Sequence, residues 1–503
     1  MDVLEVIWVL LRLLLVASFA AFVFFCCYLK RVHMKYDHIP GPPRASFFLG
    51  HFPIIWRMIK NQEVYHDLFL QWAEQYGPIV RLNAFHKVGL LITSPEGVKE
   101  YLISPEYSKD PVIYGNLFNM CGERFLGNSL TVALDYNHWL KQRRIIDPAF
   151  KRTYLKGLMG TFNDQAEALM KELEKKADGK TEVNVMNLLR RVTLDIIAKA
   201  AFGLELKTLH DDQAPFPHAV NMITEGLNST RVPLFEYMPW NRKIVKEIRE
   251  SVKLLRRTGK ECFERRRRAV KNEEEVPLDI LTQILKGVAQ EGDCEEENML
   301  DNFVNFFFAG HETCANQLSF TIMELERHPE IVAKLQAEVD DIIGMKKDIA
   351  YEDLGKLKYL SQVLKEVLRL YPPAAATLRQ TRKEDVIEGT KIPENTTLIF
   401  STYVMGRMER FFKDPLVFDP DRFRKGQPRP YFSYFPFSLG PRSCIGQKFA
   451  QMEAKLIMAK FLQWFEFKLV PPQSFKILDM GTLRPLDGVV CRLKPRHQFG
   501  YED

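Results

Sequence analysis

The chain lacks the cysteine patterns of a zinc-stabilised or secreted fold. Its eight cysteines are scattered along 503 residues and form no C-x-x-C pair. A structural zinc site and a secreted disulfide framework are both disfavoured, and the reducing cytosol fits this cysteine usage best.

Other absences narrow the possible functions further. The net charge of +6 is modest and gives no case by itself for nucleic-acid binding. No repeat and no alternation of strands and helices divides the chain, so one large domain is as compatible with the length as roughly two to four smaller ones. We find no flavin or nicotinamide motif.

Charged residues are nearly absent from the first thirty positions. Residues 3–29 are apolar apart from Glu5, Arg12 and Ser18. At about 1.5 Å per residue such a helix measures about 40 Å, which is enough to cross a bilayer core of about 30 Å. The stretch is longer than the apolar part of a signal peptide and offers no small-residue cleavage site. We predict a transmembrane signal anchor at 1–29 rather than a buried core helix.

The residues after this stretch set its orientation and its connection to the remainder. Lys30, Arg31 and Lys35 follow directly, which predicts a cytoplasmic C-terminal flank. Prolines at positions 40, 42 and 43 disfavour helix and keep the chain extended. We therefore predict a basic, proline-rich hinge at 30–43 and a cytoplasmic globular domain at 44–503, held to a membrane by a single-pass anchor.

Helical periodicity dominates the globular part. It covers most of 95–341 and is broken by expected loops at 207–217, 272–277 and 289–296. The stretches 79–82 and 90–92 have the composition of strands on either side of a turn, which predicts a small antiparallel sheet. Strand signals return at 397–400 and near the C-terminus. The expected fold is mainly α with small β-sheets.

One loop carries the strongest chemical signal, the pattern Phe-x-x-Gly-x-Arg-x-Cys-x-Gly from Phe437 to Gly446. Cysteine is a soft ligand that binds metals as the thiolate. The glycines allow tight turns and close approach of a flat cofactor, and a helix that starts just after the loop can stabilise negative charge on sulfur. We predict that Cys444 is the axial thiolate ligand of a haem and that Arg442 binds an anion nearby. The alternative is a buried structural cysteine.

Three further residues are candidates for holding the two haem propionates. Trp139 and Arg143 are spaced i and i+4, so an indole N–H and a guanidinium lie on one helical face and can clamp a carboxylate. Arg379, after the Pro372-Pro373 break, is a second candidate partner. Taken alone, each of these segments is equally an ordinary amphipathic helix or an exposed arginine.

The most informative predicted helix spans 302–320. Ala309 and Gly310 precede Glu312 and Thr313, so two small residues leave a groove in which a diatomic molecule fits above a haem. Thr313 is expected to hydrogen-bond bound oxygen, and Glu312 to relay protons from solvent. The alternative is a mid-helix threonine that bonds back to the carbonyl of Ala309 or Gly310.

Two other charged features complete the pattern. Glu366 and Arg369 are spaced i and i+3, and Arg422 follows later, so a buried network of the three is possible, as is a simple surface pair. The stretch 242–271 carries thirteen Lys or Arg against four Asp or Glu, which favours a solvated helical face, with contact to an anionic membrane or partner as the alternative.

Together these motifs resemble the cytochrome P450 superfamily over essentially the whole chain. By that resemblance the fold is the cytochrome P450 fold, the cofactor is haem b, and Cys444 is its proximal ligand. Thr313 and Glu312 serve proton delivery at the oxygen-activating motif of Ala309 to Thr313. The residues that contact the haem are expected to be Trp139, Arg143, Arg379, Phe437, Arg442, Ala309 and Gly310.

A narrower resemblance is to sterol side-chain hydroxylases of this superfamily. It rests on the stretches 39–44, 279–286, 401–408, 434–440 and 446–453. It implies a monooxygenase that hydroxylates a sterol, most simply the side chain of cholesterol at C24, with O₂ and electrons from NADPH–cytochrome P450 reductase. The reductase is expected to dock on basic residues of the cysteine side, namely Lys141, Arg144, Lys448 and Lys455.

Other functions stay open at this point. A monooxygenase of another sterol, a fatty acid or a xenobiotic fits the same motifs. A haem-thiolate isomerase or synthase needs neither O₂ nor reductase, and the acid–threonine pair argues against it. A membrane-tethered haem protein that acts as a sensor or carrier is the non-enzymatic alternative, and absence of any turnover would point to it.

Overall fold

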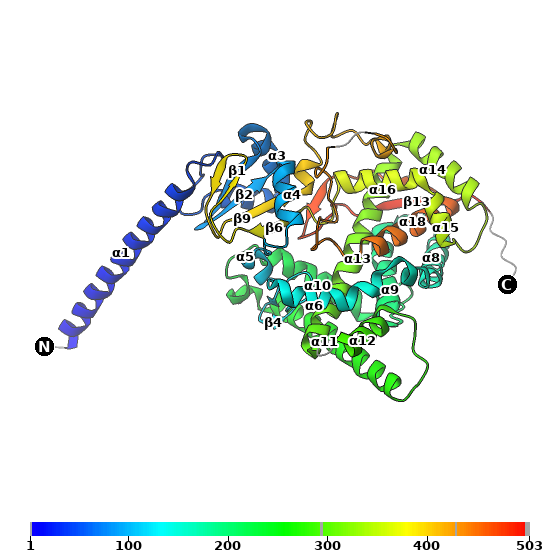
Figure 1. Cartoon of the computed structure of the whole chain (residues 1–503), viewed down its shortest axis with the longest axis horizontal. Coiled ribbons are helices and arrows are strands. Elements are labelled where there is room, and N and C mark those ends of the chain that lie inside the picture. The colour runs from blue at the N-terminus through cyan, green and yellow to red at the C-terminus, as the bar shows by residue number, and fades with distance from the viewer. Residues whose placement is uncertain (1–2, 292–294, 428–429, 498–503) are drawn as a thin grey trace.

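A computed structural model describes residues 3–291, 295–427 and 430–497 (Figure 1). Helices make up most of the globular body, and four short strands form its main sheet at the end nearest the N-terminal helix (Figure 1). The predicted loop at 289–296 lies partly outside the described residues; next to it, helix α12 continues to Glu291 and α13 begins at Glu296.

The α-helices follow one another along the whole chain with short 3₁₀ turns between some of them. Their bounds are α1 Val3–Tyr36, α2 Phe52–Lys60, α3 Tyr65–Tyr76, α4 Pro95–Ile103, α5 Pro111–Gly115, α6 Tyr136–Ile146, α7 Arg152–Lys156, α8 Met159–Glu174, α9 Val185–Phe202, α10 Pro215–Ser229, α11 Arg242–Lys271, α12 Ile280–Glu291, α13 Glu296–Glu326, α14 Pro329–Ile342, α15 Tyr351–Lys356, α16 Lys358–Leu370, α17 Thr402–Met405 and α18 Gln447–Trp464.

The strands form small sheets, and the largest has the order β1-β2-β9-β6. Their bounds are β1 Ile79–Ala84, β2 Lys87–Ile92, β3 Asn119–Met120, β4 Glu123–Arg124, β5 Val183–Asn184, β6 Ala376–Gln380, β7 Asp385–Ile387, β8 Thr390–Ile392, β9 Thr397–Ser401, β10 Phe465–Leu469, β11 Ile477–Asp479, β12 Leu483–Pro485 and β13 Val490–Pro495. The predicted antiparallel pair is confirmed as β1 and β2. The sheet itself is mixed, because β9 adds to β2 in parallel.

The N-terminal helix α1 extends away from the body (Figure 1) and is the one helix among the described residues that is long and apolar enough to cross a membrane. It does not end at residue 29 as predicted but continues to Tyr36. Leu29, His33 and Tyr36 lie on one helical face and are buried against the body. The hinge is therefore wrong for 30–36: only 37–43 is non-helical.

The proline-rich segment after α1 is fixed to the sheet rather than free. Arg81 N donates to the carbonyl of Pro40 at 2.8 Å, and Arg81 Nε donates to the carbonyl of Ile39. A Cβ on Gly41 would lie 2.6 Å from the carbonyl oxygen of Arg81, so only glycine permits this approach. Helix α1 and the globular body are consequently joined by a segment that is hydrogen-bonded to the sheet.

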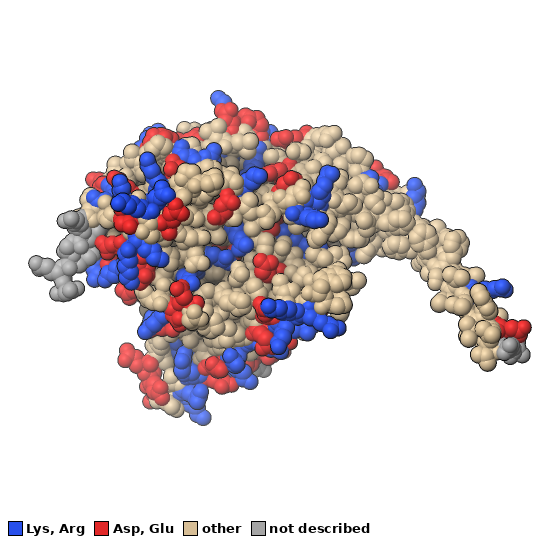
Figure 2. All heavy atoms as spheres, turned by 180° about the vertical axis from the view of Figure 1, so that it is seen from behind, with Lys and Arg blue, Asp and Glu red and all other residues tan. Residues whose placement is uncertain are grey.

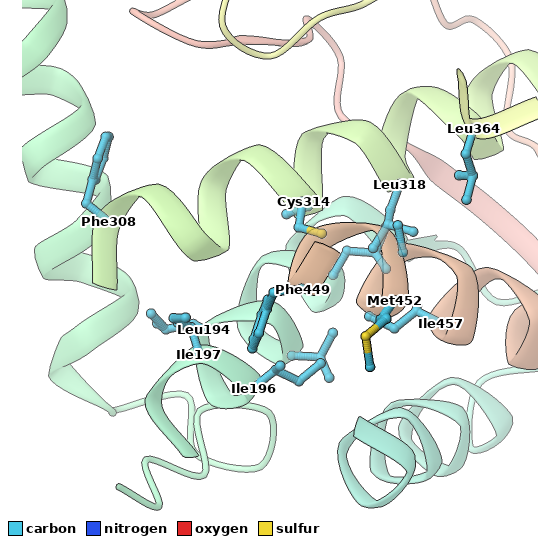
Figure 3. Packing of buried hydrophobic residues seen from close by; sticks show 14 of the residues in the cluster. Leu194, Ile196, Ile197, Phe308, Cys314, Leu318, Leu364, Phe449, Met452 and Ile457 are labelled. Atoms are coloured by element: carbon cyan, nitrogen blue, oxygen red, sulfur yellow. The ribbon is translucent and has the colours of Figure 1, made fainter. Parts of the chain in front are cut away.

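Helix α13 passes through the centre of the body and is buried on nearly every face from Asn298 to Leu325. Other elements cover each side of this helix, and they bury polar residues such as Asp301, Glu312 and Glu324 along with its apolar ones. Figure 3 shows Cys314 and Leu318 of α13 directed toward Phe449 of α18, with Ile197 of α9 close by. The core is therefore built where α13 crosses α9 and α18.

The predicted Glu366–Arg369–Arg422 network is confirmed. Arg369 donates from Nε and Nη2 to the two carboxylate oxygens of Glu366 at 2.7 and 2.6 Å, and both residues are fully buried. Arg422 Nε lies 3.4 Å from the same carboxylate. Arg369 Nη1 also donates to the carbonyls of Gly406 and Pro415, each at 2.6 Å. The network thus joins α16 to the irregular segment that leads toward Cys444.

The basic stretch 242–271 forms helix α11, and several of its arginines are ion-paired. Arg256 contacts Glu297 and Asp301, and the buried Arg266 binds Asp279. On the face seen in Figure 2, acidic and basic side chains are intermixed over the body, whereas the helical arm is largely uncharged. The exposed side chains of Arg257, Arg265, Arg267 and Arg268 agree with the solvated helical face that the sequence favoured, whereas Arg266 is buried.

Candidate functional site

The Cys444 loop is shaped by two residues with left-handed backbone. Ser438 has φ +58° and Gly440 has φ +69°. A Cβ on Gly440 would lie 2.2 Å from the carbonyl oxygen of Leu102, so glycine is required there. Cys444 N donates to the carbonyl of Phe437 at 2.9 Å, which closes the loop and places the cysteine just before α18.

The thiol of Cys444 is accessible, whereas Cys262, Cys314 and Cys491 are buried. Burial of the surrounding site raises the pKa of the Cys444 thiol, and the N–H groups of Gly446 and Gln447 oppose that rise. Arg143 and Lys109 act in the same lowering direction. The loop thus supplies N–H donors and nearby cations that stabilise a thiolate once a metal binds it.

Three cations, Lys109, Arg379 and Arg442, gather beside this loop. Arg379 is 1% and Lys109 is 9% exposed, and Arg442 Nη1 donates to the carbonyl of Ala133 at 2.8 Å. Within the part of the chain that the structure describes, none of the three forms an ion pair. Buried charges are normally paired, so this cluster fits a ligand with two carboxylates, as haem has.

The electrostatics of the cluster show how strongly it favours an anion. Burial, together with Arg379 and Arg442, lowers the pKa of Lys109 to about 8, against an opposing effect of Tyr114. Burial and the neighbouring Arg379 lower the pKa of Arg442 to about 10. Burial likewise lowers the pKa of Arg379. A bound dianion relieves this repulsion, because opposite charge favours the protonated form of each group.

Trp139 and Arg143 lie on α6, but their contacts differ from a joint carboxylate clamp. Asp135 caps the helix by accepting from His138 N. The guanidinium of Arg442 lies 4.2 Å from the ring of Trp139, which is buried. Arg143 donates to Asp147 at 2.6 Å and to the carbonyl of Ser443 at 2.8 Å. Both side chains therefore brace the residues next to Cys444.

On α13, Ala309 is exposed and Gly310 partly exposed, although their helix is otherwise buried. Ala309 and Gly310 are small for different structural reasons. A Cβ on Gly310 would lie 2.7 Å from Ile197, so Gly310 is required by the close packing of α9 rather than by an open groove. Ala309 is the residue that leaves accessible space.

The hydroxyl of Thr313 donates to the carbonyl of Ala309 at 2.8 Å. This is the local back-bond that the sequence left as an alternative. Thr313 is nevertheless partly exposed, on the same helix as Ala309. Its hydroxyl can exchange the carbonyl for another acceptor by a rotation about χ1, since threonine in a helix populates two rotamers.

Glu312 is fully buried and is held from several sides. Arg190 of α9 donates to its Oε2 at 2.5 Å, and Thr482 donates to its Oε1 at 3.2 Å. Asn316 lies 3.4 Å from the same Oε1. Burial favours a raised pKa, but Arg190 and His311 outweigh it, so the pKa of Glu312 is lowered. The group is an ionised carboxylate in reach of the partly exposed Arg190.

The comparison with known proteins decides the family. A family model described as Cytochrome P450 matches residues 40–495. The chain belongs to the cytochrome P450 family. It is 29% identical to cytochrome P450 4d2 of Drosophila melanogaster, covering 91% of this chain and 94% of that protein. It is also similar to cytochrome P450 4V2 of Rattus norvegicus, at 28% identity with coverages of 92% and 90%. Cytochrome P450 3A6 of Oryctolagus cuniculus is 26% identical, with coverages of 91% and 92%.

Membership in the cytochrome P450 family confirms the mainly helical fold with small sheets and the haem b cofactor bound through a cysteine thiolate. It also confirms the monooxygenase class, with O₂ and a redox partner as co-reactants. The apolar helix α1 agrees with a membrane anchor. The site residues and the sterol substrate remain predictions.

Sequence reasoning missed three residues of this cytochrome P450 site. Lys109 completes the cation cluster, and Arg190 and Thr482 hold Glu312. Lys109 precedes the helix start Asp110-Pro111, where Asp110 accepts from Val112 N and Ile113 N. That cap signal predicts a helix, but nothing local indicates that the helix start lies beside Arg379 and Arg442.

Glu453 of α18 is a buried acid that the predicted site does not use. It is 1% exposed, and neither carboxyl oxygen has a hydrogen-bond partner among the described residues. Burial raises its pKa from 4.5 to about 8, against an opposing effect of the Cys314 thiol. Glu453 is therefore a neutral carboxylic acid at the pH of the cytosol.

A pH dependence of stability follows from Glu453. Between pH 4.5 and about 8 the folded protein keeps this proton while the unfolded chain loses it, so the free energy of unfolding falls as the pH rises across that window. Glu453→Gln keeps a neutral side chain, so its free energy of unfolding should match that of the wild type near pH 4.5. Near pH 8 the free energy of unfolding of Glu453→Gln should be higher than that of the wild type by up to about 4 kcal/mol.

Thermal unfolding between pH 4.5 and 8.5 measures this difference. Glu466→Gln, at an exposed position of β10 on the same C-terminal segment, is the matched control and should leave the pH profile unchanged. A Tm difference between wild type and Glu453→Gln that stays constant over the range would contradict the neutral-acid assignment.

Proposed function

We propose that this cytochrome P450 hydroxylates a sterol, with the side chain of cholesterol as substrate and C24 as the position. The observation that carries the proposal is the similarity of the stretches 279–286, 401–408, 434–440 and 446–453 to cholesterol 24-hydroxylase. The apolar helix α1 supports it, because a membrane anchor keeps the catalytic domain beside a sparingly soluble substrate.

In this proposal the chain's own residues divide between holding the cofactor and delivering protons. Cys444 ligates the iron, with Phe437 on the same loop; Arg379 and Arg442, with Lys109, bind the propionates. Trp139 and Arg143 brace the loop, and Ala309 borders the accessible space on α13, next to Gly310 at its contact with α9. When bound, the haem supplies activation of O₂, and its thiolate ligand favours O–O cleavage. Glu312 holds a carboxylate in reach of solvent through Arg190, and Thr313 presents a hydroxyl to the accessible space beside Ala309.

The substrate assignment is tested by product identification. Purified protein incubated with cholesterol, NADPH and reductase should yield a product heavier by one oxygen, with fragmentation that places it at C24 of the side chain. The same incubation with a saturated fatty acid serves as comparison. Exclusive turnover of the fatty acid would transfer the proposal to the alternative substrate class, and product formed without NADPH would favour an isomerase or synthase. A haem-loaded protein without any turnover would favour a sensor or carrier.

The proton-delivery role of Thr313 and Glu312 has its own test. Thr313→Ala removes the hydroxyl and should divert electrons into peroxide, because cleavage of O₂ to water needs two protons at the distal oxygen. We expect the yield of product per NADPH to fall about a hundredfold or more, because one positioned proton-transfer group typically contributes about 10²- to 10⁴-fold. Thr313→Ser, which restores the hydroxyl, is the matched control. Fully coupled turnover by Thr313→Ala would refute the role.

The same proposal includes a docking face for reductase, and it locates the protein at the endoplasmic reticulum membrane. Lys141, Arg144 and Lys448 are exposed on the elements that flank Cys444 and suit an acidic partner. Lys455 does not fit this face as predicted. It is half-buried and donates to the carbonyl of Leu354 at 3.0 Å, so its ammonium is already used within the protein.

A further inference from the structure

The turn at 479–482, between β11 and β12, touches two distant parts of the molecule at once. Its first residue, Asp479, binds Arg231, which follows the C-terminal end of α10. Its last residue, Thr482, binds the carboxylate of Glu312 on α13. No role for this turn follows from the family motifs described above.

The contact on the α10 side is a buried, charge-assisted pair. Arg231, two residues after α10, donates from Nη2 to Oδ1 of Asp479 at 2.6 Å and from Nη1 to its carbonyl at 3.1 Å. His66 Nε2 lies 3.4 Å from the second carboxylate oxygen. Burial favours a raised pKa for Asp479, but His66 and Arg231 outweigh it and hold the pKa well below its usual range. Asp479 is thus a fixed anion that seats the end of α10.

The contact on the α13 side involves the carboxylate that the proposed function assigns to proton delivery. Thr482 is buried, and its hydroxyl donates to Oε1 of Glu312 at 3.2 Å. The same hydroxyl accepts from Asn316 Nδ2 at 3.3 Å, so its donor is directed at Glu312. Arg190 occupies the other carboxylate oxygen. Thr482, with a longer bond from Asn316 at 3.4 Å, therefore holds the carboxylate oxygen that Arg190 does not bind.

The turn itself is closed and leaves little room for independent motion of its two ends. Gly481 has φ +92° and donates its N–H to Oδ1 of Asp479 at 2.9 Å. Met480 N donates to the carbonyl of Thr482 at 3.1 Å. Gly481 also faces α10, since a Cβ there would lie 3.4 Å from Leu227. The Asp479 carboxylate therefore binds Arg231 and shapes the turn that presents Thr482.

We propose that Arg231, Asp479 and Thr482 are positioning residues that couple the seating of the end of α10 to the orientation of the Glu312 carboxylate. The inference rests on the proposed proton-delivery role of Glu312. With α10 seated, Thr482 holds Oε1 while Arg190 holds Oε2, and the carboxylate stays fixed between them. When the Arg231–Asp479 pair is broken, the turn loses its anchor on α10 and the Thr482 hydroxyl is no longer held against Oε1.

The test compares the yield of product per NADPH in purified holoenzyme variants. Thr482→Val keeps the shape of the side chain and removes the hydroxyl, so the yield should fall about three- to tenfold, the range expected for one hydrogen bond of typical net strength. Thr482→Ser should restore it. Arg231→Gln should also lower the yield of product per NADPH, but by a smaller factor than Thr482→Val. The double variant should be no worse than Thr482→Val alone, because both changes act on one contact.

Two measurements separate positioning from general damage. An oxygen-atom donor such as iodosylbenzene, used in place of O₂ and NADPH, needs no protons from the protein, so Thr482→Val should keep wild-type product formation with it. Hydrogen exchange in the absence of substrate should rise in the segment 226–241 of Arg231→Gln and stay unchanged in Thr482→Val. Arg249→Gln is the matched control: it cuts a bond between α11 and the carbonyl of Cys121, away from the turn, and should leave the yield unchanged.

The outcomes distinguish this inference from the proposed function. If Glu312→Gln uncouples turnover while Thr482→Val stays coupled, the positioning role is wrong and the proposed proton delivery stands. If Glu312→Gln stays fully coupled, both fail. Loss of activity of Thr482→Val with the oxygen-atom donor as well as with NADPH would also overturn the inference, because the turn would then act on the fold rather than on protons.

Discussion

Cys444→Ala should abolish both the thiolate-type spectrum of the reduced carbonyl complex and all reductase-driven hydroxylation. The thiol of Cys444 is accessible at the centre of a loop that is closed by its own N–H to the carbonyl of Phe437. Alanine preserves this backbone bond and the left-handed residue Gly440, so the loop keeps its shape and loses the ligand alone. Without a thiolate the iron has no proximal donor from this loop, and the effect on activity is complete.

The control for this prediction is a second cysteine close to the same site. Cys314 follows Thr313 on α13, but its side chain is buried and directed toward α18 (Figure 3). Cys314→Ala should retain the thiolate-type spectrum. The spectrum is recorded on detergent-solubilised protein with haem content measured separately, so that weak cofactor retention is distinguished from altered ligation. An unchanged spectrum in Cys444→Ala would exclude it as the ligand.

Local signals in the sequence predicted the parts of the site that lie close together in the chain. The loop from Phe437 to Gly446 combines glycine, arginine and cysteine within ten positions. Glu366 and Arg369 are one helical turn apart, and their pairing follows from helix geometry alone. The two strands of the first hairpin pair antiparallel across a short turn, as expected. In each case the interacting residues are neighbours, so spacing alone carries the information.

Contacts between distant segments were not predictable in the same way. Lys109 meets Arg379 and Arg442 across some of the longest separations in the chain, and only the folded arrangement brings these charges together. The packing of Ile197 against Gly310 likewise depends on how α9 crosses α13. The sequence predicted a groove at Gly310, whereas the structure packs Ile197 there, and the sequence could not identify Arg190 or Thr482 as partners of Glu312.

The continuation of α1 beyond residue 29 was available from the sequence and was missed. Lys30, Arg31 and Lys35 indicate the end of an apolar span, but they do not end a helix. Leu29, His33 and Tyr36 recur at helical spacing, and all three are buried against the body. The predicted membrane span and the helix α1 therefore differ in length. The basic residues mark the end of the apolar stretch, whereas the helix itself ends at Tyr36, before the segment 37–43 that is bound to the sheet.

Arg369→Ala should be the most destabilising single substitution among those considered. It leaves the carboxylate of Glu366 fully buried with its bidentate partner gone, and it removes donors from the carbonyls of Gly406 and Pro415. Breaking a buried ion pair from one side costs about 3–5 kcal/mol. That is a large share of the roughly 5–15 kcal/mol by which domains are stable. We expect a large loss of folded, haem-containing protein, measured as haem content and Tm.

Two comparisons show whether burial or mere pairing causes this loss. Arg369→Lys keeps the charge but not the planar fork that binds Glu366 and two carbonyls, so it should recover little stability. Lys175→Ala breaks an ion pair with Glu172 at the same i, i+3 spacing, but the lysine side chain is 65% exposed. Its effect should stay within about 1 kcal/mol, as for other surface pairs. An equal change in Tm for Arg369→Ala and Lys175→Ala would mean that Arg422, 3.4 Å from Glu366, compensates the buried carboxylate on its own.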